Sequence, residues 1–140
     1  MNALLDGKIV LVSGGTQGVG AAVARAAAAE GATVAITGRR PEPGEALAAT
    51  LRAGGTRAMF VHADVADVAQ SQASAAAVIT AYGRVDCLVN SAGLTSRGSL
   101  LDTSPELFDQ HIAVNLRAPF FLMQAVVKDM LTTPQASPSA

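Results

Sequence analysis

The sequence predicts an α/β fold in which helices cover both faces of a parallel β-sheet. Four short apolar segments alternate with helix-forming segments along the chain, and this alternation indicates right-handed crossovers between parallel strands. The chain is also rich in hydrophobic residues, 50%, and poor in charged ones, 15%, as expected where strands are buried on both faces. A chain of 140 residues predicts one domain, which we assign to residues 1–131. The small, polar, proline-containing tail, 132–140, is expected to be disordered.

The first strand, residues 9–12, runs into a turn of sequence Ser-Gly-Gly-Thr-Gln-Gly-Val-Gly and then into an alanine-rich helix at about 19–30. Gly14 can adopt the backbone angles of a tight turn, Gly18 leaves no side chain between backbone and phosphate, and Gly20 lets helix and strand pack closely. The helix N-terminus presents free N–H groups and a positive dipole end to an anion. Strand, glycine turn and helix are typical of a Rossmann-type dinucleotide-binding fold, for which the strand order would be 3-2-1-4.

The second and third strands follow the same alternation. Residues 33–37 are rich in β-branched side chains and end at a glycine. Residues 41–43 contain two prolines and are expected to form a loop, after which a helix runs to about Ala53. Gly54 and Gly55 then separate this helix from a third strand, 58–62.

The last two helices begin with recognisable caps. Asp67 is expected to cap a helix that a glycine ends shortly before the fourth strand, 86–90. Ser104 followed by Pro105 is the pattern of an N-cap with proline at the first helical position. The final helix is expected to reach about Leu131, with a kink at Pro119. We expect the fold to be truncated after this helix.

Composition excludes several classes of function. The net charge of −1 gives no support for binding to nucleic acid or to an anionic membrane. Cys87 is the single cysteine, so no internal disulfide is expected, and a small core residue in a reducing, cytoplasmic protein is the simplest interpretation. No apolar window is long enough for a membrane span, and Asp6 interrupts the only apolar stretch near the start. His62 and His111 are isolated, ending a strand and lying on the last helix respectively, so no metal site is predicted.

Four signals recur along the chain: the glycine turn, Asp64 and Val65 after the third strand, Asn90, Ser91, Ala92 and Gly93 after the fourth, and Asn115 in the last helix. In this order and spacing they resemble the N-terminal part of the short-chain dehydrogenase/reductase family, over nearly all of residues 7–131. The family has threonine where this chain has Ser13, and Asn-Asn-Ala-Gly where it has Asn-Ser-Ala-Gly.

The resemblance implies a dinucleotide site and one residue of a proton relay, Asn115. The cofactor-binding positions it implies are Ser13, Gly14, Thr16, Gln17, Gly18, Val19, Gly20, Arg39, Arg40, Asp64, Val65, Asn90, Ala92 and Gly93. Each signal also has a plain structural interpretation. The glycine turn can be a turn only, Asp64 a turn residue, Asn90 a strand-end cap and Asn115 a solvent-facing helix residue.

The residues after the second strand indicate which cofactor is bound. Dinucleotide folds that bind NAD usually carry an acid there, which accepts hydrogen bonds from the ribose, whereas this chain has Arg39 and Arg40. A guanidinium can grip a 2′-phosphate through two hydrogen bonds, so NADP(H) is predicted, with Arg39 the first candidate ligand. NAD remains an alternative through Glu42 as a late ribose acid, and both arginines could simply solvate a loop. Gln17 stands where many NADP-binding members carry a basic residue.

The catalytic residues that the resemblance implies are absent. The family uses a serine and a tyrosine with a lysine four residues later, which lowers the pKa of the phenol from about 10. Tyr82 is the only tyrosine and Asp86 stands four residues on. Two serines at 137 and 139 lack a preceding strand. We therefore expect a hydride-transferring oxidoreductase by family that is inactive as 140 residues, or else a non-catalytic dinucleotide-binding module or remnant that associates with a longer homologue.

The same pattern predicts self-association. The fourth strand would form an open edge of the sheet, where unpaired backbone groups invite other chains. The last helix carries too many apolar residues for one buried face: Leu107, Phe108, Ile112, Val114, Leu116, Phe120, Phe121, Leu122, Val126 and Val127. A homo-oligomer through this helix, or aggregation, is expected. The substrate, a carbonyl or alcohol by resemblance, cannot be narrowed further.

Overall fold

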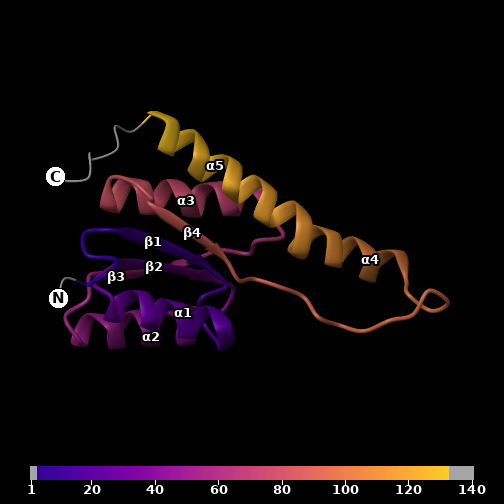
Figure 1. Cartoon of the computed structure of the whole chain (residues 1–140). Helices are drawn as coiled ribbons and strands as arrows, with labels where there is room; N and C mark the ends of the chain where they lie inside the picture. The colour runs from indigo at the N-terminus through magenta and orange to yellow at the C-terminus, as the bar shows by residue number, and fades with distance from the viewer. Residues whose placement is uncertain (1–2, 133–140) are drawn as a thin grey trace.

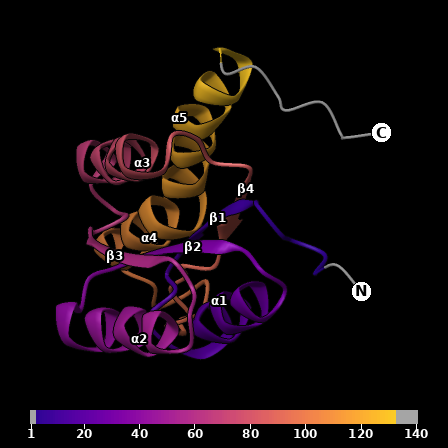
Figure 2. The ribbon, with the colours of Figure 1, turned by 90° about the vertical axis from the view of Figure 1, so that its left-hand side faces the viewer.

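The computed structural model describes residues 3–132, which form three layers (Figure 1). The strands are β1 Ile9–Ser13, β2 Thr33–Gly38, β3 Ala58–His62 and β4 Cys87–Asn90. The helices are α1 Gly18–Ala29, α2 Pro41–Ala53, α3 Val68–Tyr82, α4 Pro105–Ile112 and α5 Ala118–Thr132, with a π-helical turn, η1 Ala113–Arg117, between the last two. Helices α1 and α2 cover one face of the sheet, and α3 and α5 cover the other (Figure 2).

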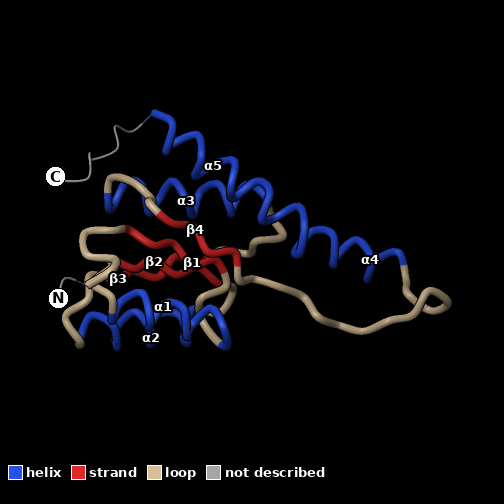
Figure 3. Tube along the Cα trace, viewed as in Figure 1, coloured by secondary structure: helices blue, strands red, loops and turns tan. Residues whose placement is uncertain are grey.

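The sheet confirms the predicted topology. Its strands are parallel and lie in the order β3-β2-β1-β4 (Figure 3). The register pairs Ser13 with Thr37 on one side and with Asn90 on the other, and pairs Gly38 with His62. The carboxyl ends of all four strands therefore meet at one edge of the sheet, where ligands bind in folds of this kind.

Two apolar cores flank the sheet because successive β1 side chains point to opposite faces. Val10 and Val12 pack in the core under α1 and α2, whereas Ile9 and Leu11 pack in the core under α3 and α5. All five β1 residues are buried, as expected for a central parallel strand covered on both faces.

Strand β4 is the open edge that the sequence predicted. Within the described residues it pairs with β1 and with no other strand. Cys87 is consequently exposed, and the expectation that it is a small core residue is wrong. Cys87 pairs with Val10, whose side chain points to the face covered by α1 and α2, but these helices pack on β1, β2 and β3 and leave the outer strand uncovered there.

Helix α2 begins three residues earlier than expected. The predicted loop at 41–43 is wrong, because Pro41 is the first residue of the helix. Proline lacks an N–H group, but the first N–H groups of a helix have no intrahelical acceptor, so proline costs little there. The helix therefore starts directly after Arg40, which becomes its N-cap residue.

The predicted caps of α3 and α4 are confirmed. The Asp67 carboxylate accepts a hydrogen bond from the Gln70 N–H at 3.2 Å, and the Ser104 hydroxyl accepts one from the Leu107 N–H at 3.1 Å. Gly83 ends α3 with φ +91°, a left-handed conformation that glycine adopts without a steric penalty.

The last helical segment differs from expectation at Pro119. No sharp kink follows, since α4 and α5 run on in nearly one direction (Figure 1), and the irregularity is the π-helical turn η1 directly before Pro119. Proline cannot donate to the carbonyl four residues back, and its ring crowds that carbonyl. The wider turn, in which the Ala118 N–H bonds to the Ala113 carbonyl, removes this conflict. Thr132 ends α5, and the remaining tail residues, including both candidate serines, lie outside the described residues.

Candidate functional site

The glycine turn is anchored to both neighbouring strands at the carboxyl edge of the sheet. The Thr37 carbonyl accepts hydrogen bonds from the N–H groups of Gly14 at 3.0 Å and Gly15 at 3.1 Å. The N–H of Ser91 donates to the Ser13 carbonyl at 2.9 Å. The turn after β1 therefore lies against the ends of both β2 and β4, and Ser13 itself is buried.

Three glycines of the turn have separate structural reasons. Gly14 has φ +75°, and a side chain there would place its Cβ 2.5 Å from the Ala92 backbone nitrogen. A Cβ at Gly20 would lie 2.1 Å from the Gly14 carbonyl oxygen. Gly20 thus allows α1 to pack against the turn itself, rather than against the strand as expected. Gly18 has φ +55° and faces open space, which leaves room for a ligand beside the backbone.

The N-terminus of α1 is uncapped. Gln17 occupies the N-cap position but makes no side-chain hydrogen bond to its own helix, and the first turn holds no acidic residue. Helices α3 and α4 differ, because Asp67 and Ser104 satisfy an N–H there. The first-turn N–H groups of α1 and the positive end of its dipole are therefore free to bind an anion next to Gly18. Val19, in the same turn, is 75% exposed.

The turn after β2 carries the two arginines beside the glycine turn. Arg40 donates from Nη2 to the Gln17 Oε1 atom. His62 donates from Nε2 to the Arg39 carbonyl oxygen at 3.0 Å, since a carbonyl can only accept. A Cβ at Gly38 would lie 2.5 Å from the Thr16 methyl carbon, so the two turns are in close contact. Both arginine side chains are exposed.

The turn after β3 is a tight, self-bonded segment. Asp64 accepts from the Ala66 N–H at 3.0 Å through Oδ1, and its own N–H donates to the Gln70 side chain at 2.9 Å. Val65 is buried. Arg117, from η1, donates to the Ala66 carbonyl at 2.9 Å. Asp64 therefore fulfils the turn role that the sequence left open, which by itself neither requires nor excludes a ligand contact.

Asn115 holds the backbone after β4 and does not simply face solvent. Its Oδ1 accepts from the Leu94 N–H at 2.8 Å, and its Nδ2 donates to the Leu94 carbonyl at 2.9 Å. The segment with Asn90, Ala92 and Gly93 is thereby fixed between the glycine turn on one side and η1 on the other.

His111 extends this network in a way that sequence reasoning missed. Its Nδ1 lies 3.4 Å from Asn115 Nδ2, and its Nε2 lies 3.1 Å from the Ser96 hydroxyl. The His111 ring therefore lies between the Asn115 amide and the Ser96 hydroxyl. The four-residue spacing of His111 and Asn115 on a helix was the available sequence signal.

The geometry agrees with the comparisons to known proteins. The sequence profile of short chain dehydrogenases matches residues 8–137. This chain belongs to the short-chain dehydrogenase family.

Several relatives with established names match this chain over about half of their own length. D-threitol dehydrogenase of Mycolicibacterium smegmatis is 45% identical over 129 residues, which are 91% of this chain and 49% of that enzyme. L-rhamnose 1-dehydrogenase (NAD(P)(+)) of Sphingomonas sp. is 36% identical over 129 residues, 91% of this chain and 51% of that enzyme. A short chain dehydrogenase from Burkholderia cenocepacia in complex with NADP superposes with a TM-score of 0.86 at 41% identity, over 89% of this chain and 51% of that one. The chain thus spans about half the length of the curated relatives it matches.

Tyr82 does not serve as the tyrosine of a short-chain dehydrogenase site. It ends α3, which runs antiparallel to the strands, so it lies at the amino edge of the sheet, opposite the glycine turn. The Arg57 guanidinium stacks over its ring at 4.5 Å from the centroid. Burial raises the pKa of Tyr82 above its usual value, against the lowering effect of Arg57 and Arg52. A phenol with a raised pKa is a poor base near neutral pH.

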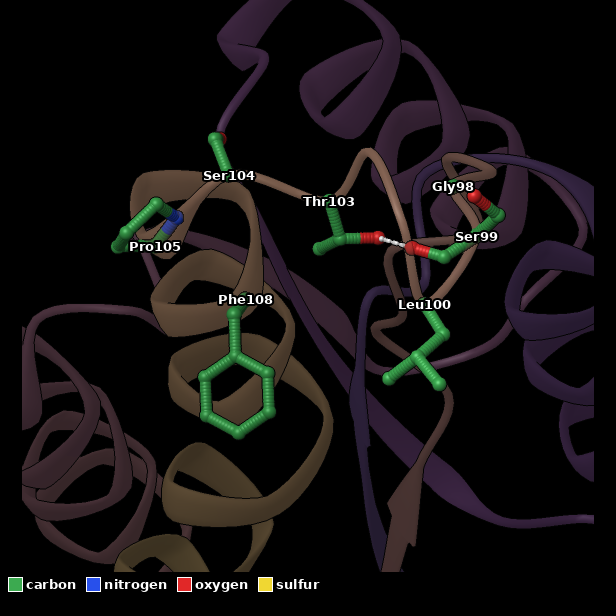
Figure 4. Close-up of a pocket in the computed structure, with 7 residues that line it drawn as sticks. All are labelled: Gly98, Ser99, Leu100, Thr103, Ser104, Pro105 and Phe108. Atoms are coloured by element: carbon green, nitrogen blue, oxygen red, sulfur yellow. Dashed lines mark hydrogen bonds between the residues drawn. The ribbon is translucent and has the colours of Figure 1, made fainter.

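A shallow pocket lies between the loop before α4 and the first turn of that helix, within residues 98–108 (Figure 4). Thr103 donates its hydroxyl to the Ser99 carbonyl at 2.7 Å across it, and Leu100 and Phe108 are exposed at its rim. The Ser99 N–H and hydroxyl bond to Asp102 and hold the pKa of that carboxyl below its usual value. The pocket belongs to the loop before α4 and to α4 itself, which together extend beyond the sheet (Figure 1).

Neither a metal nor a membrane is indicated by the described part of the chain. Among residues 3–132, no group of three or more His, Cys, Asp and Glu side chains could hold a metal ion. No helix in the same range has the length and apolar character needed to cross a membrane.

Proposed function

We propose that this chain is the cofactor-binding part of an oxidoreductase that transfers hydride between NADP(H) and a carbonyl or alcohol substrate. The observation that carries the proposal is the uncapped N-terminus of α1, open at Gly18, with Arg39 and Arg40 close beside it. Support also comes from relatives, since the Burkholderia dehydrogenase was crystallised with NADP and the rhamnose dehydrogenase is named for NAD(P)(+).

The roles we assign follow the edge of the sheet. The free N–H groups of α1 beside Gly18 receive the pyrophosphate, and the guanidinium of Arg39 or Arg40 receives the 2′-phosphate. The turn at Asp64 and Val65 borders the adenine, and the segment from Asn90 to Gly93 lines the nicotinamide side. When bound, the nicotinamide supplies or accepts the hydride. Ser13, Thr16 and Asn115 act by holding these segments in place, as their hydrogen bonds and contacts indicate.

We propose further that these 140 residues bind the cofactor without catalysing hydride transfer. General acid–base catalysis at the carbonyl oxygen needs a group with a pKa near the working pH, and the sequence contains no Tyr-x-x-x-Lys. We place the protein in the cytoplasm, on its single free Cys87, which suits a reducing compartment.

Titration of the purified chain with NADPH and with NADH tests the cofactor assignment. NADPH is expected to bind more tightly by on the order of tenfold, because hydrogen bonds to a charged group contribute about 1.5–3 kcal/mol. The variant with Arg39→Ala and Arg40→Ala should lose this difference, whereas Arg25→Ala, an exposed arginine on α1, should keep it. Equal affinities in the wild type would refute NADP(H) preference. NADPH oxidation by the chain with a carbonyl substrate would refute the absence of catalysis.

A second candidate function is a non-catalytic module that pairs with a longer homologue. The observation that favours it is a row of exposed apolar side chains along α4, η1 and α5, namely Phe108, Ile112, Leu116, Phe120, Met123 and Val127. Spacings of three and four residues place these side chains along one side of the helical segment. We propose that this row, called here the apolar row, is where copies of the chain or a homologue associate.

A further inference from the structure

Gln17 and Arg40 form a contact that neither residue's position in its own helix explains. Each is the N-cap residue of a helix, Gln17 of α1 and Arg40 of α2, and neither side chain caps its own helix. Instead the Arg40 Nη2 atom donates to Gln17 Oε1 across the space between the two turns. The bond joins residues 23 positions apart in the sequence, one in each turn at the carboxyl edge of the sheet.

The partner of Arg40 is neutral, and this determines what the guanidinium can still do. Among residues 3–132, the one ion pair within 4.0 Å joins Arg84 to Asp86 at the opposite edge, so Arg40 has no carboxylate partner there. A guanidinium has five N–H donors, and a single bond to an amide oxygen leaves others free. The full positive charge therefore remains available to an anion that also meets Arg39.

Holding the side chain before a ligand arrives favours binding. An exposed arginine has many rotamers, and restricting them on binding opposes affinity through lost conformational entropy. The hydrogen bond to Gln17 restricts the rotamers of the Arg40 side chain before the ligand binds, and it leaves the charge of the guanidinium uncompensated. His62 adds to this rigidity by bonding the Arg39 carbonyl at 3.0 Å, which fixes the backbone between the two arginines.

We propose that Gln17 is a positioning residue for cofactor choice: its amide oxygen holds the uncompensated Arg40 guanidinium where a 2′-phosphate would bind. This inference rests on the proposed function, in which Arg39 and Arg40 receive that phosphate. It explains how a neutral residue can favour a 2′-phosphate from this position, by directing the charge of Arg40 rather than by supplying its own.

Two small ligands, 2′,5′-ADP and 5′-ADP, isolate the effect, because the first carries the 2′-phosphate and the second does not. Affinities are measured by calorimetry for the full chain and for Gln17→Ala, Gln17→Glu, Arg40→Ala and the Gln17→Ala/Arg40→Ala double variant. Gln17→Glu keeps the acceptor and the shape but adds a negative charge. A matched control is Gln72→Glu, which makes the same change at an exposed site on α3.

Gln17→Ala is expected to weaken 2′,5′-ADP several-fold, and Gln17→Glu on the order of tenfold, because the glutamate neutralises Arg40 and repels the phosphate. Both variants should bind 5′-ADP within about twofold of the wild type, and Gln72→Glu should match the wild type for both ligands. Adding Gln17→Ala to Arg40→Ala should change nothing further, since the effect acts through Arg40.

The outcomes separate the inference from the function on which it rests. If the wild type binds the two ligands equally, the NADP(H) assignment is wrong and the inference falls with it. If the wild type prefers 2′,5′-ADP and Arg40→Ala loses that preference while both Gln17 variants keep it, the inference alone is wrong. Equal weakening of both ligands by Gln17→Ala would also overturn it, because that result indicates a general role in the glycine turn.

Discussion

At the scale of single residues, the candidate site depends on backbone atoms more than on side chains. Gly14, Gly18 and Gly20 each meet a different demand: a left-handed turn against Ala92, open space for a ligand, and close packing of α1 on the turn. Asn115 likewise acts through the backbone of Leu94. Side chains that would touch a ligand directly are few, and Arg39 and Arg40 are the main candidates.

Gly20→Ala should disrupt the glycine turn. The new Cβ would lie 2.1 Å from the Gly14 carbonyl oxygen and 3.0 Å from the Gly15 Cα, and such overpacking costs about 1–3 kcal/mol. Urea unfolding should show this loss of stability, and NADPH titration should show much weaker binding. Gly54→Ala is the control, because Gly54 has φ −82° and its nearest contact would be 3.5 Å away. Similar unfolding midpoints for the two variants would contradict the packing argument.

At the scale of elements, the helix N-termini divide into two kinds. Helices α3 and α4 have a side-chain acceptor at the N-cap, whereas α1 and α2 have none. The capped helices are fixed by their own residues, and the uncapped pair start at the turns that carry the glycines and the arginines. The backbone N–H groups at these helix N-termini lack side-chain acceptors, and a phosphate can accept their hydrogen bonds.

Removing a cap should therefore affect stability only where a cap exists. Asp67→Ala should lower the free energy of unfolding by about 1 kcal/mol, whereas Asp67→Asn, which keeps an acceptor, should retain most of it. Gln17→Ala should leave the free energy of unfolding nearly unchanged, because the Gln17 side chain does not cap α1. Chemical denaturation of the three variants measures the difference. A loss of similar size for Gln17→Ala would show that α1 is capped after all.

The last helical segment contains a proline, Pro119, inside an otherwise continuous helix. Pro119 removes a hydrogen-bond donor inside a long apolar helix, and the π-helical turn η1 absorbs the loss just ahead of it. The same turn carries Asn115 and Arg117, which bond to the backbone of Leu94 and Ala66. A π-helical turn at this place thus connects the long helix to the loops after β3 and β4.

At the scale of the whole molecule, the described chain has a well-packed sheet with two incompletely covered surfaces. One is the open edge of β4. The other is the apolar row, which spans roughly 30 Å from Phe108 to Val127 at 1.5 Å per residue. Leu122 and Val126 on the same helix are buried against the sheet and α3, so the row is the side of the helix turned away from the core. A continuous exposed apolar surface of this kind marks an interface or an aggregation site.

The apolar row should make the chain associate. Sedimentation velocity over a range of protein concentrations is expected to show dimers or larger species for the wild type and less association for Phe120→Glu, which places a charge in the middle of the row. Lys128→Glu, an exposed change on the same helix but outside the row, should associate like the wild type. A wild type that remains monomeric at all concentrations would exclude the interface.

Features that depend on residues close together in the chain could be predicted from the sequence. The alternation of strands and helices, the glycine turn, the caps at Asp67 and Ser104 and the excess of apolar residues on the last helix were all predictable. Each follows from local backbone preferences or from the period of the apolar pattern. Family membership followed from the same local signals, and the profile match confirms it.

Contacts between residues far apart in the chain could not be predicted from the sequence and depend on the packing of the sheet. The bonds of Arg40 to Gln17, His62 to Arg39 and Asn115 to Leu94 join positions 21–23 residues apart, and no local pattern encodes such pairs. They arise because parallel strands bring their carboxyl ends, and hence the turns that follow them, to one edge of the sheet. The exposure of Cys87 was likewise decided by tertiary structure, since it depends on which strands α1 and α2 cover. Short-range preferences specify the elements, whereas packing decides which side chains share a site.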